Sequence, residues 1–428
     1  MFFSAGALSS TSWLGACGNS AIPAVGGATS SGSTGASRFA DIGPLKPVDA
    51  NGLMLPEGFT SRVVAVSGEA PVVGGTHVWH TFPDGGATYL TADGGWIYTS
   101  NSEVPLLPQG GCGALKFDAQ GNVVSSYSIL TGTRGNCAGG KMPWGTWMSC
   151  EEVSNGLVYE CDPFQAGQGV ARPVFGRYNR EAIAVDPLNQ IFYLTEDAGT
   201  GRFYRYVPNA SDWPMGAVRP ALTAGQGTLQ VARFAALTTN QAPPAEFNLA
   251  TPNAIVWEDV ASPDMAQSTV RTGLGNEAPG TPFDGGEGLW YFNGFIYFST
   301  KGDSRIWVLD INAQTIEAIY DLATATPGNA ILDGVDNLTV SEFGDVLVAE
   351  DGGDMDICVI LPDRNLRRLL KASDVTDGGS EITGPAFSPD GTRLYFSAQR
   401  SGRNGVPGPG ITFEVTLPFS ACPSGACP

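Results

Sequence analysis

Histidine is almost absent from this chain, which has only His77 and His80 among 428 residues. Zinc sites with several histidine ligands are therefore almost excluded. A Ser-His-Asp triad is disfavoured because the two histidines lie only three positions apart. Any metal site must rely on oxygen ligands, which suit Ca²⁺ or Mg²⁺, or on a cysteine thiolate, which suits a transition metal.

Positive charge is also scarce. The chain carries 23 Lys and Arg against 42 Asp and Glu, a net charge of −19. Nucleic acids and anionic membrane surfaces are poor partners for such a chain, because both need a basic footprint. The Gly-x-Ser-x-Gly, Walker and His-Glu-x-x-His motifs are absent from the sequence as well.

Long stretches with helical apolar periodicity are missing, whereas Gly (57) and Pro (30) are abundant. Both facts favour an all-β chain of many turns. One hairpin-like pattern recurs, in which two short apolar runs flank a turn and an acidic cluster follows. It covers residues 181–197, 287–303, 336–351 and, less acidic, 384–399. Such repetition predicts a single β-propeller, six-bladed by our count of units, closed by pairing an early strand at 60–66 with the last one at 411–416.

The domain organisation follows from composition. Residues 1–17 resemble a lipoprotein leader ending in Leu-Gly-Ala-Cys17, although the basic start of a signal is missing. We expect the true start to lie upstream; the alternative is a disordered leader. Residues 18–38 are expected to be a flexible linker and 39–428 the propeller, with an irregular insertion at 209–280 that is either a lid or a surface decoration.

Acidic residues occupy equivalent places in the repeats. Glu181, Glu287 and Asp336 open the first strand of their copies, so their carboxylates should converge at the channel mouth and bind cations. A second set ends the following strands and should meet them there. It comprises Glu103, Glu196, Asp197, Asp303, Glu350 and Asp351. The plain alternative is that these acids cap turns, as we expect for the Asp-Gly pairs at 84, 93 and 390.

Cysteine adds further candidates. We expect a disulfide between Cys422 and Cys427, and a second one between Cys112 and Cys137. A two-residue turn at 155–156 would place Cys150 opposite Cys161. Cys150 is then either bridged to Cys161, a free metal ligand, or an inert buried thiol.

Several strings resemble the PhoX-type alkaline phosphatases, over about residues 70–415. The most specific is Pro143-Trp-Gly-Thr-Trp-Met-Ser-Cys-Glu-Glu152, and others lie at 82–87, 98–103, 175–181, 193–197 and 336–338. The resemblance implies a six-bladed propeller, exported by the twin-arginine route, that hydrolyses phosphate monoesters with calcium and iron (Ca²⁺ and Fe³⁺).

The resemblance also implies site residues. Cys150, Glu181 and Glu287 would bind iron. Calcium ligands or near-site residues would be Glu103, Glu152, Asp197, Asp336 and Glu350. Arg177, Arg180 and Lys301 are the basic residues nearest these acids and would either contact an anionic substrate or neutralise the cluster. The chain departs from the family pattern at Ser102, Arg180 and Gly285, where the family favours His, His and Arg; loss of that Arg removes a bidentate phosphate contact.

The resulting expectation is an exported, monomeric, metal-dependent phosphoester hydrolase with a small phosphorylated substrate. It would be periplasmic, or held at the membrane only through a lipid on Cys17. The alternatives are a non-catalytic calcium-binding surface propeller and a calcium-dependent lactonase.

Overall fold

The computed structural model describes residues 36–260, 278–372, 380–402, 407–424 and 427. The chain divides into two units, Met1–Ala36 and Ser37–Pro428. The predicted leader, nearly all of the linker, Cys17 and residues 261–277 of the predicted insertion therefore lie outside the described residues. Within the described chain, no helix has the length and apolar character needed to cross a membrane.

The second unit is all-β, with two described 3₁₀ turns, η1 (Pro173–Phe175) and η3 (Leu322–Thr324). Three of its sheets have four strands. In spatial order they are β3 (Pro83–Leu90), β4 (Trp96–Ser102), β5 (Gly110–Phe117), β6 (Val123–Thr133); β10 (Val170–Ala171), β9 (Val158–Cys161), β8 (Trp147–Glu151), β7 (Asn136–Lys141); and β2 (Thr60–Val66), β26 (Ile411–Thr416), β25 (Arg393–Ala398), β24 (Ile382–Phe387).

The other two sheets are larger, with five and nine strands. The five-stranded sheet runs β1 (Leu53–Met54), β23 (Leu366–Ala372), β22 (Asp356–Ile360), β21 (Val346–Glu350), β20 (Val335–Val340). The nine-stranded sheet runs β11 (Arg180–Asp186), β12 (Ile191–Glu196), β13 (Tyr204–Pro208), β14 (Gly227–Phe234), β15 (Asn253–Asp259), β19 (Thr315–Asp321), β18 (Arg305–Asp310), β17 (Phe295–Thr300), β16 (Gly286–Phe292).

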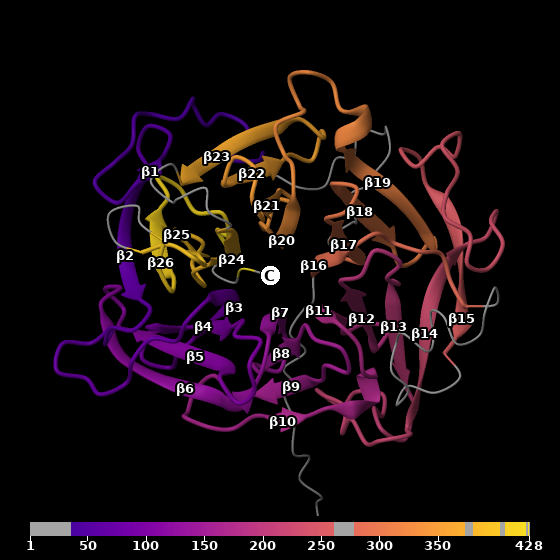
Figure 1. Ribbon diagram of the computed structural model, residues 1–428, viewed down its shortest axis with the longest axis horizontal. Coiled ribbons are helices and arrows are strands. Elements are labelled where there is room, and N and C mark those ends of the chain that lie inside the picture. Colours follow the sequence, from indigo (N-terminus) through magenta and orange to yellow (C-terminus); the bar gives the residue numbers. More distant parts are fainter. Residues whose placement is uncertain (1–35, 261–277, 373–379, 403–406, 425–426, 428) are drawn as a thin grey trace, which may run out of the picture. The chain divides into compact units, whose positions relative to one another are not determined.

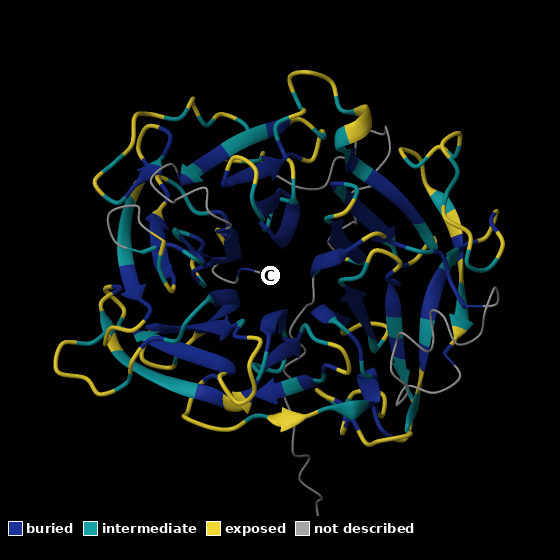
Figure 2. Ribbon diagram, viewed as in Figure 1, coloured by how far each residue is buried: buried dark blue, intermediate teal, exposed yellow. Residues whose placement is uncertain are grey.

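Within this unit the sheets stand around a central axis, with β3, β7, β11, β16, β20 and β24 innermost (Figure 1). These inner strands are almost wholly buried, and exposed residues concentrate on the outer turns (Figure 2). Apolar and aromatic side chains fill the spaces between neighbouring sheets, as where Tyr98 of β4 stacks on Tyr395 of β25 at 5.1 Å between ring centroids. The predicted all-β, propeller-like fold is confirmed.

The predicted ring closure is also confirmed, because β2 pairs antiparallel with β26 from Thr60↔Thr416 to Val66↔Ile411. The prediction for 209–280 needs correction. Residues 227–234 and 253–259 are not irregular but form β14 and β15, which extend the sheet that begins with β11.

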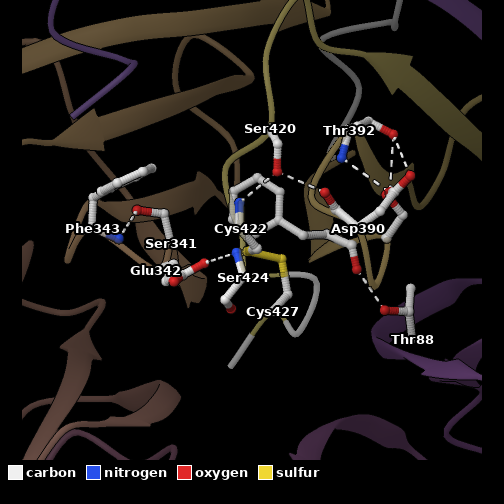
Figure 3. Close-up of a disulfide and its surroundings, with 12 residues drawn as sticks. Thr88, Ser341, Glu342, Phe343, Asp390, Thr392, Ser420, Cys422, Ser424 and Cys427 are labelled. Carbon is white, nitrogen blue, oxygen red and sulfur yellow. Dashed lines mark hydrogen bonds between the residues drawn. A yellow bond between two sulfur atoms is a disulfide. The ribbon is translucent and has the colours of Figure 1, made fainter. Parts of the chain in front are cut away.

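The C-terminal segment folds back under the inner strands and is closed by the predicted Cys422–Cys427 disulfide (Figure 3). Its backbone bonds to two inner hairpins, from Glu342 N–H to Ala421 O at 3.1 Å and from Ala421 N–H to Gly391 O at 2.8 Å. Lys141 Nζ, at the end of β7, donates to Cys427 O at 3.1 Å. Three inner strands are thereby joined at the ends opposite their first residues.

Candidate metal centre

Each inner strand carries the same irregularity near its start. The pairing register shifts between Pro83 and Gly86 in β3, and at the matching place in β7, β11, β16, β20 and β24. A β-bulge re-aims the side chains it contains and is common beside active sites. The first bulge residue in successive strands is Asp84, Cys137, Glu181, Glu287, Asp336 and Gly384. We call this set the inner ring.

A second set of equivalent positions directly follows the six strands that pair with the inner strands, namely β4, β8, β12, β17, β21 and β25. In every case the residue there donates its backbone N–H to the carbonyl of the residue that precedes the inner strand, as from Glu103 to Phe82 at 2.9 Å and from Lys301 to Gly285 at 2.7 Å. The six such residues are Glu103, Glu152, Asp197, Lys301, Asp351 and Gln399. We call this set the outer ring.

The two rings meet at one mouth of the channel, as the sequence predicted for its two acidic sets. Ligand atoms of Glu181, Glu287 and Asp336 lie within 4.8 Å of one another. Three further groups meet the same limit: Asp336, Asp351, Glu381; Asp84, Glu103, Glu381; and Glu103, Cys137, Glu152. The channel behind them is lined by small residues, including Gly86, Gly140 and Gly288.

Several of these carboxyls are buried in an environment that disfavours their ionised form. Burial, then the carboxylates of Glu287, Glu152 and Asp336, raise the pKa of Glu181 well above its usual range. Burial raises the pKa of Asp336 to about 7, although the ammonium of Lys301 opposes this. Crowded carboxylates of this kind need compensating cations.

Two cations of the chain reach these acids. Lys301 Nζ lies 2.9 Å from Glu287 Oε1, 3.1 Å from Asp351 Oδ2 and 3.8 Å from Asp336 Oδ2. Arg400 lies 3.4 Å from Glu103 and 3.7 Å from Glu381. Among the described residues the carboxylates of the centre still outnumber the cations in contact with them, so the residues present fit bound metal ions.

The thiol at the centre is Cys137, whose Sγ lies 3.2 Å from Glu181 Oε1. Burial, then Asp84 and Glu181, raise the pKa of Cys137 well above its usual range. The expected disulfide between Cys112 and Cys137 is absent, as both are free and buried. A thiol beside a carboxylate is a ligand pair for a transition metal, which requires the thiolate.

Cys150 is not brought to this centre. It lies among Met148, Val158 and other apolar side chains, and burial raises its pKa to about 12. The expected pairing of Cys150 with Cys161 is wrong: the register places Cys150 opposite Val158 and Cys161 opposite Trp147, and both cysteines are free. The two strands are joined by residues 152–157 rather than by a two-residue turn, so every pairing is displaced.

Other expected site residues lie apart from the two rings. Glu350 accepts bonds from the backbone N–H groups of Asp333 and Asp356, in a separate buried group with Asp356 and Cys358. Arg180 is buried against Tyr178, with its guanidinium 3.6 Å from the ring centroid.

Asp303 pairs with Arg305, away from the rings. Arg177 is half-buried, and its positive charge opposes the rise in the pKa of Tyr159 that burial and Glu151 cause.

Sequence reasoning missed the carboxyls of Asp84 and Glu381, the thiol of Cys137 and the guanidinium of Arg400, as well as the amide of Gln399 in the outer ring. Asp84 was expected to cap a turn, but it is 1% exposed and belongs to the inner ring. Asp93 and Asp390 do serve their turns, since each accepts a backbone N–H two residues on. The signal that could have found Asp84 and Cys137 is their place at the bulge, equivalent to that of Glu181.

Fold and site together define a class, an all-β propeller-like protein whose hub carries an acidic centre suited to hard cations. The model of the family described as alkaline phosphatase PhoX matches residues 98–319 and 306–402. These residues make up well over half of the chain, and the chain belongs to this family.

A solved structure supports the propeller-like fold, and two others match more weakly. PhoX of Pseudomonas fluorescens, in complex with the transition-state analogue vanadate, matches with a TM-score of 0.66 and 16% identity, covering 90% of this chain and 99% of that one. A gluconolactonase of Xanthomonas campestris matches with a TM-score of 0.44 and 15% identity, covering 88% and 98%. Regucalcin, a calcium-binding protein of Agrobacterium tumefaciens, matches at 0.39 and 13%, covering 80% and 94%. No curated protein matches the sequence.

Proposed function

We propose that this protein is a metal-dependent phosphoester hydrolase of the PhoX type. The observation that carries the proposal is the excess of buried carboxylates, with one thiol, at one mouth of the channel. Glu181 Oε2 is buried and accepts no hydrogen bond from the described residues. An oxygen of this kind is costly unless a cation binds it.

The donor sets suggest which ions the centre takes. Carboxylate groups such as Asp84, Glu103 and Glu381 suit Ca²⁺, which prefers six to eight oxygens. Cys137 with Glu181 suits iron as Fe³⁺, in the role first assigned to Cys150. When bound, such ions supply Lewis-acid polarisation of a phosphoryl group and lower the pKa of water. Glu287, Asp336, Glu152 and Asp197 complete the predicted ligand set.

Two basic side chains of the protein can bind and orient the phosphate group of the substrate. Lys301 and Arg400 have partly exposed side chains, 33% and 42%, beside the buried acids. Their charged heads can orient an incoming phosphoryl oxygen toward the rings. The guanidinium of Arg400 can bind a phosphate through two N–H groups at once. It can therefore supply the contact that is lost at Gly285, where the family favours Arg. A catalytic role for Arg177 and Arg180 stays a prediction.

Architecture, location and partners complete the proposal. We count six blades, with the nine-stranded sheet as two blades joined where β15 pairs with β19 at only Asn253↔Ile316 and Ala254↔Thr315. The proposed protein is an exported monomer, delivered by the twin-arginine route to the periplasm or anchored by a lipid on Cys17. Its substrate is a small phosphate monoester rather than a nucleic acid, in keeping with the net charge of −19.

The test is a phosphatase assay on the full chain produced through an export pathway and supplied with Ca²⁺ and iron. We expect hydrolysis of some phosphate monoesters in a broad panel, and its loss in Glu287→Gln. Glu57→Gln, at an exposed pair with Lys46, is the matched control and should behave as wild type. Metal-loaded protein that cleaves no phosphate ester would refute the proposal, and cleavage of lactones alone would select the lactonase alternative.

A further inference from the structure

The outer ring contains one residue, Lys301, whose side-chain charge is opposite to that of its acidic equivalents. Its members at equivalent backbone positions are acidic in four sheets, neutral in one (Gln399), and basic at Lys301. The equivalence rests on the shared backbone hydrogen bond, from Lys301 N–H to Gly285 O as from Asp351 N–H to Gly334 O. Lys301 therefore stands where the repeat otherwise supplies a metal-type ligand.

The ammonium of Lys301 has the surroundings of a bound cation. Glu287, Asp351 and Asp336 place oxygens at 2.9, 3.1 and 3.8 Å from Nζ. Glu287 and Asp336 are themselves only 1% and 3% exposed, so these charges have little help from water. Three carboxylates at these distances favour the charged form of the Lys301 side chain.

The local backbone leaves room for this arrangement. Gly285 has φ +70°, and a Cβ there would lie 3.7 Å from Lys301 Cβ and 3.2 Å from Asp197 Oδ1. A side chain at 285 would press on Asp197 Oδ1 and would strain the backbone at this positive φ, whereas its contact with Lys301 would be an ordinary one. Glycine at 285 therefore keeps the space beside Asp197 and Lys301 open.

We propose that the ammonium of Lys301 permanently occupies one cation position of the centre, between Glu287, Asp336 and Asp351. Metal ions then bind through the remaining groups, Asp84 with Glu103 and Glu381, and Cys137 with Glu103, Glu152 and Glu181. Glu287 and Asp336 can still ligate a neighbouring ion, through the carboxylate oxygens that do not face Lys301. The inference rests on the proposed function in one respect, that the centre binds metal. It goes beyond it by assigning to a side chain a place that a divalent ion would otherwise take.

The rival reading is that Lys301 serves only the substrate and leaves the metal sites unaffected. The two differ in metal content, which can be measured without any assay of activity. Removing a fixed charge from among three carboxylates opens an oxygen-rich position that a divalent cation can fill. Removing a substrate ligand changes KM and leaves the number of bound ions unchanged.

The experiment compares exported wild type with Lys301→Met, Lys301→Glu and Lys301→Arg after equilibrium dialysis against Ca²⁺ and elemental analysis. We expect Lys301→Met and Lys301→Glu to bind about one additional divalent cation per chain, since Glu restores the acid of the other repeats. Lys301→Arg keeps the charge and should match wild type. The control is Lys116→Met, at an exposed pair with Asp93 outside the rings.

Folding is checked by the unfolding temperature with and without Ca²⁺, which should rise more steeply with Ca²⁺ in Lys301→Met than in wild type. If either Lys301→Met or Lys301→Glu is folded and its metal content equals that of wild type, the inference is overturned. If neither folds even with Ca²⁺, the ammonium is not exchangeable for a metal ion, and the inference is overturned as well. If wild type itself binds no metal, the proposed function fails independently.

Discussion

The same inner strands form both mouths of the channel, but the two mouths differ in the groups that line them. At the first mouth, buried carboxylates face one another with too few cations, as around Glu181 and Asp336. At the second mouth, the described residues of the C-terminal segment join three strands by hydrogen bonds, and the Cys422–Cys427 disulfide closes the segment (Figure 3). The first mouth therefore depends on cations that the described residues do not supply in full, whereas the second is held by contacts within the chain.

Metal removal should separate the two mouths most clearly. Chelating the ions of loaded protein is expected to abolish phosphatase activity and to lower the free energy of unfolding by about 4 kcal/mol for each ion held at a thousand times its Kd. The second mouth has no part in this loss. Calorimetry and activity before and after chelation, with Ca²⁺ re-addition as the control, provide the measurement. An unchanged unfolding temperature would mean that the acidic mouth is self-sufficient.

The effect of Glu181→Gln on the free energy of unfolding should be opposite in metal-loaded and metal-free protein. In loaded protein the substitution removes a ligand, and we expect weaker metal binding and lower stability. In metal-free protein it replaces a buried carboxyl whose ionised form the surroundings disfavour, and we expect a gain of about 1–3 kcal/mol. Urea denaturation of both states measures the difference, with Glu57→Gln as the exposed control. The same sign in both states would contradict the view that ion binding is the function of this carboxylate.

Opening the loop at the second mouth should have a smaller effect. Because Cys422 and Cys427 are separated by only five positions, replacing both by Ala should cost about 2 kcal/mol in the free energy of unfolding. Metal content should not change, because the loop contacts the far ends of the inner strands. A loss of bound metal in the double variant would show that the mouths are coupled.

A difference in pH dependence is also expected, best seen in metal-free protein. The pKa of Asp336 is raised to about 7, so the folded state binds its proton more tightly than the unfolded chain. Stability from this group is present below about pH 4 and is lost as the pH rises through about 7. Burial lowers the pKa of Lys141 from 10.5 to about 8, so stability from that group rises between these values.

Urea denaturation across this pH range checks both signs. Lys141→Met should remove the rise in the free energy of unfolding above pH 8. It should leave in place the loss of stability between about pH 4 and 7 that we assign to Asp336. If Lys141→Met leaves the alkaline limb unchanged, Lys141 does not titrate within the folded protein as we infer.

The sequence predicted the all-β, propeller-like fold and the convergence of Glu181, Glu287 and Asp336, because both depend on repetition. Hairpin periodicity marks the strands, and equivalent positions of Glu181, Glu287 and Asp336 are visible by alignment of the chain with itself. Cys137 was missed because its residue type differs from that of its equivalents. Asp84 was missed because Asp-Gly is also a turn signal.

Other errors have a geometric cause. Side chains alternate across a strand, so a shift of one position reverses the face. Glu350 and Asp351 were both candidates, and only Asp351 reaches the rings, while Glu350 binds backbone N–H groups within its own sheet. The loop between β8 and β9 was longer than the turn assumed, which displaced Cys150 from its expected partner. Neither choice is decided by local sequence.

The pairing of β2 with β26 has a consequence for the timing of folding. Thr60, made early, finds its partner Thr416 only when nearly the whole chain exists. Until then β2 is an unpaired edge that can recruit other chains. A product truncated before β26 lacks that strand and also leaves β2 exposed as an unpaired edge. Only a chain that extends to β26 can therefore cover β2 and close the ring.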